Sequence, residues 1–369
     1  MITLEVKGNK FKGFTDISVF RSVETISGSF SFSATNDDVV SFPIKAGDPC
    51  RILIKNESVI DGFVESLQVS YDADTHSIAL SGRDKTADVI DSSVIGKKEF
   101  VGPISLKNII ETTLSDNGIT GISVINKAGS IESFKEGEFF SAEIGATVFE
   151  FIEKYARKRQ VLLTTDGNGN IILARAGTDT AIITLQTIKG GTENNILSAN
   201  VNYDFTQRFN KYIMESQLNP SAFSFGADVD NANVVNQSGT DTDDKIRESR
   251  QLRIMSGSSD SSGDLGNLAT WHANLRRARS TDYSIVVQGF HQDDAQTKLW
   301  IPNQLVQIID EFADVSATLL IRSVEYNFNL TTGSTTTISL VDKDAYTLEA
   351  NISNAEERVN KIGNNLIFG

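Results

Sequence analysis

Two stretches that lie far apart in this chain carry the same succession of strand-like blocks. The matching pairs are residues 47–52 with 303–308, 65–71 with 322–328, and 78–84 with 338–344. The order of the blocks is kept, and the spacing between them changes little. Such self-similarity indicates a duplicated structural unit. The alternative is that any two antiparallel meanders look alike. If the repeat is real, one chain holds two similar barrels, and three chains present six equivalent faces.

Apolar and polar side chains alternate along these blocks. Val324, Tyr326 and Phe328 alternate with Glu325 and Asn327. A period of two places one face of a strand on a core and the other toward solvent, as in antiparallel sheets. Short strands separated by turn residues are typical of β-sandwiches and small β-barrels. The pattern therefore predicts a mainly β protein.

The region between the two β segments changes character. Ser105 is a helix cap, with Gly118 just past the predicted helix end. Thr147 and Glu150 form a capping box that opens a second helix. Residues 161–173 then read as a β-hairpin, because a turn rich in Asp, Asn and Gly joins two apolar runs. The region is predicted to be a compact α+β module.

Residues 219–263 are rich in Ser, Asp, Asn and Gly, and we expect mobile loops or a fold that depends on a partner. A helix follows, with Asp264 as its cap. Its predicted apolar face consists of Leu268, Trp271, Leu275 and Ala278. Three arginines in its last turn are interpreted as cations that complement the helix dipole rather than as an anion site. They are Arg276, Arg277 and Arg279.

The predicted fold class is mainly β with α+β insertions. The predicted domains are a first β-barrel (1–100), an α+β middle domain (101–188), a discontinuous second β-barrel (189–218 and 283–348), a polar loop and helix insertion (219–282), and a C-terminal helix and tail (349–369). The chain ends in the apolar residues Leu366, Ile367 and Phe368. This segment is either a frayed tail or a docking site for a partner.

Charge and cysteine content narrow the function classes. The chain has 34 Lys and Arg residues against 48 Asp and Glu residues, a formal charge of −14. This balance argues against sequence-specific or wrapping contacts with nucleic acid, which need clustered positive charge, but not against a wall past which nucleic acid slides. The single cysteine excludes an intrachain disulfide and fits folding in a reducing cytosol. No secretory signal or membrane-spanning run is recognised, so no membrane insertion is expected.

A search for catalytic chemistry finds no candidate. His76, His272 and His291 show no metal-binding spacing, and no nucleophile elbow, phosphate-binding loop or dinucleotide fingerprint occurs. The loop that begins at Asp166 imitates a calcium loop only in its first positions, so a turn is favoured. Cys50 is interpreted as a buried side chain that packs in the core from within a strand. No catalytic, cofactor-binding or metal-binding residue is predicted, no cofactor is expected, and a structural protein rather than an enzyme is favoured.

Blocks along nearly the whole chain resemble the baseplate hub proteins of contractile-tailed bacteriophages, particularly the Mu-like branch. They are residues 30–35, 61–65, 81–91, 156–163, 271–274, 300–306 and 342–346. The resemblance implies a homotrimer with two related barrel domains per chain. Its ring would form a pseudo-sixfold platform between the hexameric tail tube and the trimeric spike. The polar stretch at 219–263 departs from any recognised pattern.

The resemblance also implies where and with what the protein works. The expected partners are the tail tube protein, the baseplate spike protein and other baseplate proteins. The expected location is the virion tail baseplate, assembled in the cytoplasm of the host bacterium, with DNA passing through an enclosed channel. The acidic composition predicts a negative channel wall to which DNA does not adhere.

A rival hypothesis is a tail-associated protein that binds or degrades the cell wall. Its sign would be an aromatic-lined groove in the 101–188 region. Phe134, Phe139 and Phe140 are candidates for such a groove, but packing in a core beneath the helix that begins at Thr147 is the favoured interpretation.

Overall fold

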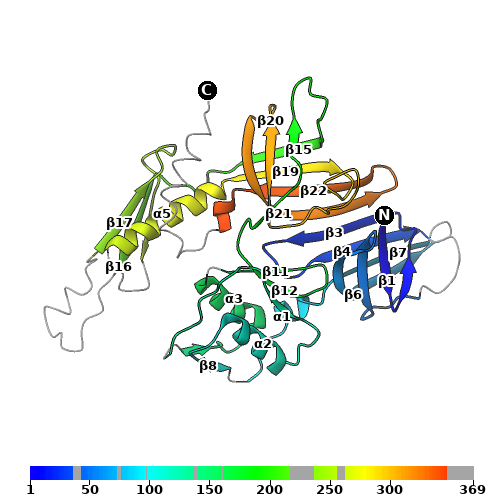
Figure 1. Cartoon of the computed structure of the whole chain (residues 1–369), viewed down its shortest axis with the longest axis horizontal. Helices are drawn as coiled ribbons and strands as arrows, with labels where there is room; N and C mark the ends of the chain where they lie inside the picture. The colour runs from blue at the N-terminus through cyan, green and yellow to red at the C-terminus, as the bar shows by residue number, and fades with distance from the viewer. Residues whose placement is uncertain are drawn as a thin grey trace. The chain divides into compact units, whose positions relative to one another are not determined.

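The computed structural model describes residues 1–35, 43–72, 76–96, 98–136, 139–159, 161–216, 237–255 and 262–346 (Figure 1). The chain divides into two compact units. The first comprises Met1–Val201 and Tyr283–Leu340, and the second comprises Asn202–Asp282 and Val341–Gly369. The predicted C-terminal helix and the segment Leu366–Phe368 lie outside the described residues.

A large, mostly antiparallel sheet dominates the first unit. Its N-terminal strands are β1 (Ile2–Val6), β2 (Asn9–Phe11), β3 (Asp16–Ser22), β4 (Ser29–Thr35), β5 (Pro49–Ile54), β6 (Glu57–Tyr71) and β7 (His76–Asp84). Its later strands are β13 (Asp179–Thr180), β14 (Leu185–Thr187), β15 (Ile196–Tyr203), β19 (Thr281–Gln288), β20 (Gln304–Asp310), β21 (Val315–Asn329) and β22 (Gly333–Val341). The main path runs β15-β19-β22-β21-β3-β4-β7-β6-β5-β1-β2, and β20 joins β21 to β13 and β14.

The strand order itself contains the predicted repeat. The sequence β3-β4-β7-β6-β5 in the first half has its counterpart in β15-β19-β22-β21-β20 in the second half. β6 and β21 both have 15 residues, and β7 and β22 both have nine. The prediction of a mainly β, antiparallel protein is confirmed. The path is open within the described residues, and the two β-barrel domains predicted from the sequence remain a prediction.

One antiparallel strand pair joins the two halves into a single sheet. β3 pairs with β21 over seven residues, from Ser22 opposite Ser323 to Asp16 opposite Asn329. The Ser18 hydroxyl donates to a Glu325 carboxylate oxygen at 2.7 Å across this pair. Below it, one continuous core contains apolar side chains from both halves, among them Val19, Phe32, Leu80, Ile285, Trp300, Tyr326 and Leu340.

The middle region of the first unit is an α+β module. Its helices are α1 (Ala87–Asp91), α2 (Leu106–Asp116) and α3 (Val148–Lys158), and its strands are β8 (Glu99–Val101), β9 (Val124–Asn126), β10 (Phe139–Ser141), β11 (Leu162–Thr165) and β12 (Ile171–Ala174). The predicted caps are confirmed. Ser105 accepts from the Asn108 amide. Thr147 and Glu150 each accept from the other's backbone amide.

The second unit contains the strands β16 (Lys211–Ser216), β17 (Gln237–Thr242) and β18 (Gln251–Met255), the helix α5 (Ser262–Ala278) and the short 3₁₀ helix η1 (Lys343–Tyr346). β16 lies between the other two strands. The expectation of loops throughout 219–263 is therefore wrong for β17 and β18. Their backbone hydrogen bonds to β16, with α5 packed beside them, supply order that the polar composition did not predict. α5 also begins at Ser262, two residues before the predicted cap Asp264.

The buried face of α5 agrees only in part with the predicted one: Ala278 is buried as predicted, and the Leu268 side chain lies outside what the structure describes. Leu265, Ala269 and Ala273 form a core with Tyr212 and Met214 of β16, whereas Trp271 and Leu275 are only partly buried. Small side chains allow the helix to approach the sheet closely. A Cβ on Gly239 would lie 2.0 Å from the backbone nitrogen of Gly266. Hydrophobic periodicity selected the larger side chains and missed this constraint.

A buried ion pair organises the second unit. Arg208 and Asp243 are 5% and 3% exposed, and the guanidinium donates to both carboxylate oxygens. Arg277 approaches the same carboxylate at 3.7 Å, so it serves this pair in addition to the predicted dipole role. Removing one partner of such a pair leaves an uncompensated buried charge and is strongly destabilising.

Substituting Gly239 by Ala is expected to destabilise the second unit by about 1–3 kcal/mol, because the new methyl group meets backbone. Gly266→Ala is the matched control. A Cβ there would meet no atom within 4 Å, and Ala is favoured over Gly inside a helix by up to ~1 kcal/mol. Thermal unfolding of both variants checks this. Equal effects of the two substitutions would contradict the close approach.

Candidate assembly surfaces

The titratable groups that the sequence singled out are dispersed. His76 stacks on Tyr71, and His272 contacts Arg276, which together with burial lowers the pKa of His272 to about 4. Cys50 is buried in β5, and burial raises the pKa of its thiol to about 12. Among the described residues, no three His, Cys, Asp or Glu side chains are grouped as metal ligands.

The loop that imitates a calcium site is a turn, as predicted. One Asp166 carboxylate oxygen accepts from the amides of Asn168 and Asn170, and the other accepts from the Asn170 side chain. The carboxylate is thus occupied within its own loop. These hydrogen bonds lower the pKa of Asp166 against the opposing effect of burial.

This turn attaches the middle module to the large sheet. The Ser58 hydroxyl donates to the Gly167 carbonyl at 2.6 Å, and the Arg21 guanidinium donates to the Thr165 carbonyl at 2.8 Å. A Cβ on Gly167 would lie 1.8 Å from the Ser58 carbonyl oxygen. The hairpin β11–β12 therefore sits on β6 and β3 at backbone distance, and only glycine fits at this position.

Asp84 is a buried carboxyl group at the same attachment. It ends β7, and its Oδ2 atom has no hydrogen-bond partner among the described residues. Burial raises its pKa to about 7, against lowering contributions from the Thr86 amide, Arg21 and Lys85, while Asp61 raises it further. Sequence patterns marked Asp84 only as the end of a strand, because burial depends on the docked hairpin.

Among the strand edges of the large sheet that are open within the described residues are those of β15 and of the second half of β6. β15 is the terminal strand of the path, with β19 as its neighbour. β6 pairs with β5 only over Glu57–Phe63, so its second half has β7 on one side and an open edge on the other. Exposed apolar side chains lie at both edges, namely Leu197 on β15 and Val69 on β6. Unpaired edges of this kind are ready to pair with another chain.

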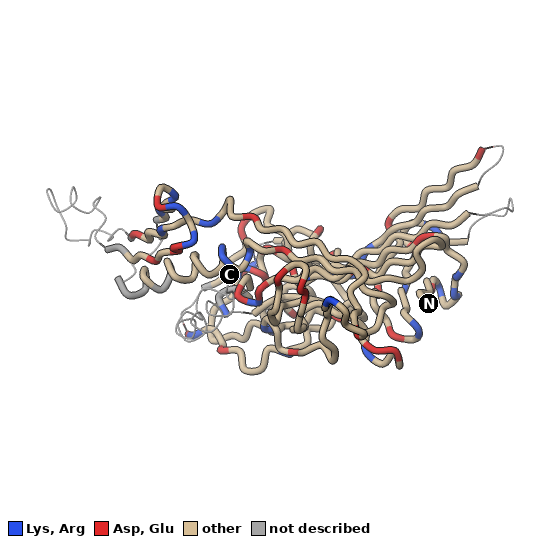
Figure 2. Tube along the Cα trace, turned by 90° about the horizontal axis from the view of Figure 1, so that it is seen from above, with Lys and Arg blue, Asp and Glu red and all other residues tan. Residues whose placement is uncertain are grey.

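One face of the sheet lies over the core, and the other carries short uncharged polar side chains. Asn327, Ser18, Ser31 and Ser81 form one row across β21, β3, β4 and β7. Figure 2 shows that the long strands are largely free of charged residues. The cation on this face, Arg83, is paired with Glu65 and Asp91.

The aromatic residues considered for a glycan groove are mostly in the core. Phe134 and Phe140 are buried and pack edge to face against each other and against Tyr155 of α3. The prediction that they pack beneath the helix is confirmed for both. The Phe139 side chain lies outside what the structure describes.

The substitution Asp84→Asn tests the buried carboxyl group. Because the folded-state pKa lies above the unfolded value, the folded chain binds an extra proton between pH 4 and 7, and its stability falls as pH rises through this range. The variant lacks this titration, so its advantage over wild type grows toward pH 8, with an upper bound of roughly 4 kcal/mol at about 1.4 kcal/mol per pKa unit. Urea unfolding at pH 5 and 8 measures it. A pH-independent difference would contradict the assignment.

Family models match three parts of the chain. Residues 1–84 match the N-terminal domain of Mu phage baseplate assembly protein GpP-like proteins, residues 86–175 match the second domain of gp44-like baseplate hub proteins, and residues 265–349 match the fourth domain of GpP. Together the three models cover more than half of the chain. No helix of the described residues has the length and hydropathy needed to cross a membrane.

Whole-chain comparisons agree. Baseplate hub protein gp44 of Escherichia phage Mu is 26% identical over 347 residues, which cover 94% of this chain and 88% of gp44. The 43 kDa tail protein of prophage MuSo2 from Shewanella oneidensis has a TM-score of 0.78 and 28% identity, covering 94% of this chain and 99% of its own. A tail protein from Neisseria meningitidis has a TM-score of 0.75 at 17% identity, covering 95% and 98%, and shows the shared fold. The chain therefore belongs to the Mu-like family of phage baseplate hub proteins.

Proposed function

We propose that this baseplate hub protein works as a homotrimeric ring that adapts the sixfold tail tube to the threefold spike and encloses the DNA channel. Its tasks are structural, and the matched relatives are named as baseplate, hub and tail proteins. Its proposed partners are the tube protein, the spike protein and other baseplate proteins, with assembly in the host cytoplasm. The domain boundaries predicted from the sequence, the two-barrel description and the docking role of Leu366, Ile367 and Phe368 are kept as parts of this proposal.

The main support for the proposal is that the open edges of β15 and β6 correspond, in the repeat, to the strands β3 and β21 that already pair inside the chain. β3 of the first half pairs with β21 of the second half. In the repeat, the counterpart of β3 is β15 and the counterpart of β21 is β6. These counterparts are the strands with open edges. Pairing β15 of one copy with β6 of the next would therefore repeat the internal junction between chains, and three chains with two halves each give six such junctions.

Such a ring would also provide hydrogen-bond partners for the backbone groups at the exposed strand edges. Backbone donors and acceptors along β15 and the second half of β6 would gain partners, and the exposed side chains of Leu197 and Val69 would be covered. An obligate interface of this type is expected to bury roughly 2,000 Å² or more.

The oligomer and its contact strands are tested together. Light scattering across a dilution series should give a mass near three times the 40.3 kDa chain. Ser198→Cys in β15, combined with Ser66→Cys, Gln68→Cys or Ser70→Cys in β6, should give interchain disulfides on mild oxidation. The native Cys50 is buried and serves as the background. A monomer that does not cross-link in any combination would overturn the proposed ring.

The open face of the sheet is the surface that we place along the channel, because the opposite face lies in the core. Its row of Ser and Asn side chains offers phosphates no ion pairs and offers bases no stacking surface. The composition predicted an acidic channel wall, whereas this face would give a largely neutral, polar wall. Its negative charge would come from Glu325 on β21 and Asp16 on β3.

Introducing Ser31→Lys and Ser81→Lys into phage particles should slow genome release several-fold at low ionic strength, and added salt should restore the rate, since lysine–phosphate contacts are screened. Ser31→Gln with Ser81→Gln is the matched neutral control of similar bulk. Release kinetics followed by dye binding to emerging DNA measure the effect. Equal release rates for the Lys and Gln variants would contradict the assignment of this face to the channel wall.

A further inference from the structure

We propose that one end of the sheet, where β6 and β21 finish and lead into their hairpins with β7 and β22, is the docking surface for a sixfold-symmetric ring of a second protein. Tyr71 and Leu330 are the proposed apolar contacts. The inference rests on the proposed trimer and goes further by assigning one end of the sheet to one class of partner. It follows from how the duplicated elements are distributed between the two ends of the strands.

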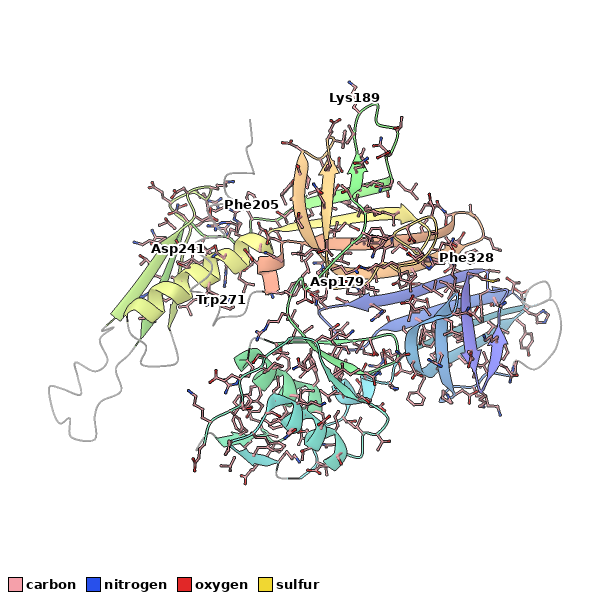
Figure 3. The ribbon with its side chains drawn as sticks, viewed as in Figure 1. Asp179, Lys189, Phe205, Asp241, Trp271 and Phe328 are labelled. Atoms are coloured by element: carbon pink, nitrogen blue, oxygen red, sulfur yellow. The ribbon has the colours of Figure 1, made fainter. Side chains whose placement is uncertain are left out.

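The two hairpins point in the same direction. From β21 through β3, β4 and β7 to β6, each neighbouring pair is antiparallel, so β21 and β6 run the same way. The registers align Asn329, Asp16, Ser33, Ala79 and Gln68 in a single row. Leu330 lies one residue beyond this row, and Tyr71 lies three residues beyond it. The last residues of β6 and β21 thus lie at the same end of the sheet, which Phe328 marks in Figure 3.

Each of these strands presents a strongly exposed apolar side chain near its end, in addition to Val69 on β6. Tyr71 is 78% exposed and Leu330 is 71% exposed. Both are held at defined positions. Tyr71 stacks on His76 across the β6–β7 pair, and the Asn329 side chain accepts from the Thr331 amide while donating to Asp16. Ordered apolar side chains of this kind are suited to insertion into depressions on a partner.

Elements that occur once per chain lie at the opposite end of the strands. The middle module contacts Ser58, near the start of β6. The loop between β20 and β21 precedes the start of β21 and carries Phe312, which is 96% exposed. Its counterpart between β5 and β6 is only the two-residue turn Lys55–Asn56. The Lys189 backbone amide donates to a Glu311 carboxylate oxygen in this loop.

The symmetry of the partners then distinguishes the two ends of the strands. A sixfold partner presents six equivalent contacts, so each chain of a trimer must offer two equivalent ones. The hairpin end offers one exposed apolar side chain from each half, Tyr71 and Leu330; in the repeat Tyr71 aligns with Phe328, two residues before Leu330. The opposite end carries features that recur only three times in a trimer, which fits a threefold partner.

The test compares Tyr71→Ser, Leu330→Ser and the double variant in binding to the purified tail tube protein of the same phage, measured by co-sedimentation with assembled tubes. Each single variant should weaken docking to a similar extent, and the double variant should weaken it by at least about tenfold, as expected for loss of hot-spot contacts. Phe312→Ser is the matched control at the other end and should dock like wild type.

Light scattering and thermal unfolding of every variant show whether the chain still folds and forms trimers. Loss of tube docking by the double variant, with an unchanged trimer mass, supports the inference. Unchanged docking of the double variant, or loss confined to Phe312→Ser, overturns it. A wild-type chain that does not form trimers, or does not dock on tubes at all, overturns the proposed function instead.

Discussion

The pairing of β3 with β21 is the interaction on which the architecture depends. It joins strands about 300 residues apart in sequence, so that two similar β regions share one sheet and one core. Without it, each half would expose a long edge and a hydrophobic face. With it, the first unit becomes a continuous sheet, and two of its strands with open edges, β15 and β6, are the repeat counterparts of the strands already joined. In the proposed trimer, the same strand geometry that joins the two halves of the chain would join one copy to the next.

Local features could be predicted where local chemistry determines them. Ser105, Thr147 and Glu150 cap helices through contacts within three residues, and the Asp166 turn closes on itself. Alternation located β21 and β22, and internal similarity anticipated the repeated strand order. Contacts between distant segments were not predictable in this way. The burial of Asp84 requires the β11–β12 hairpin above it, and the ion pair of Arg208 with Asp243 requires a strand arrangement that a Ser- and Asp-rich composition did not suggest.

The candidate assembly surfaces likewise combine features that the sequence predicts with features that depend on contacts between distant segments. Sequence patterns indicated six equivalent faces for three chains, but they did not show which strands keep open edges or where the hairpin ends point. Those properties depend on register, since a shift of one residue would exchange the serine face for the core face. Side chains considered for a glycan site, Phe134 and Phe140, proved to be core because the α3 helix covers them.

Cys50 carries a consequence for the covalent stability of this baseplate protein. Its sulfur is enclosed in β5, and its high pKa keeps it as the unreactive thiol near neutral pH. With no second cysteine in the chain, no intrachain disulfide can form or be broken. The covalent structure of the hub is therefore insensitive to the redox potential of its surroundings, and its durability rests on strand pairing and packing alone.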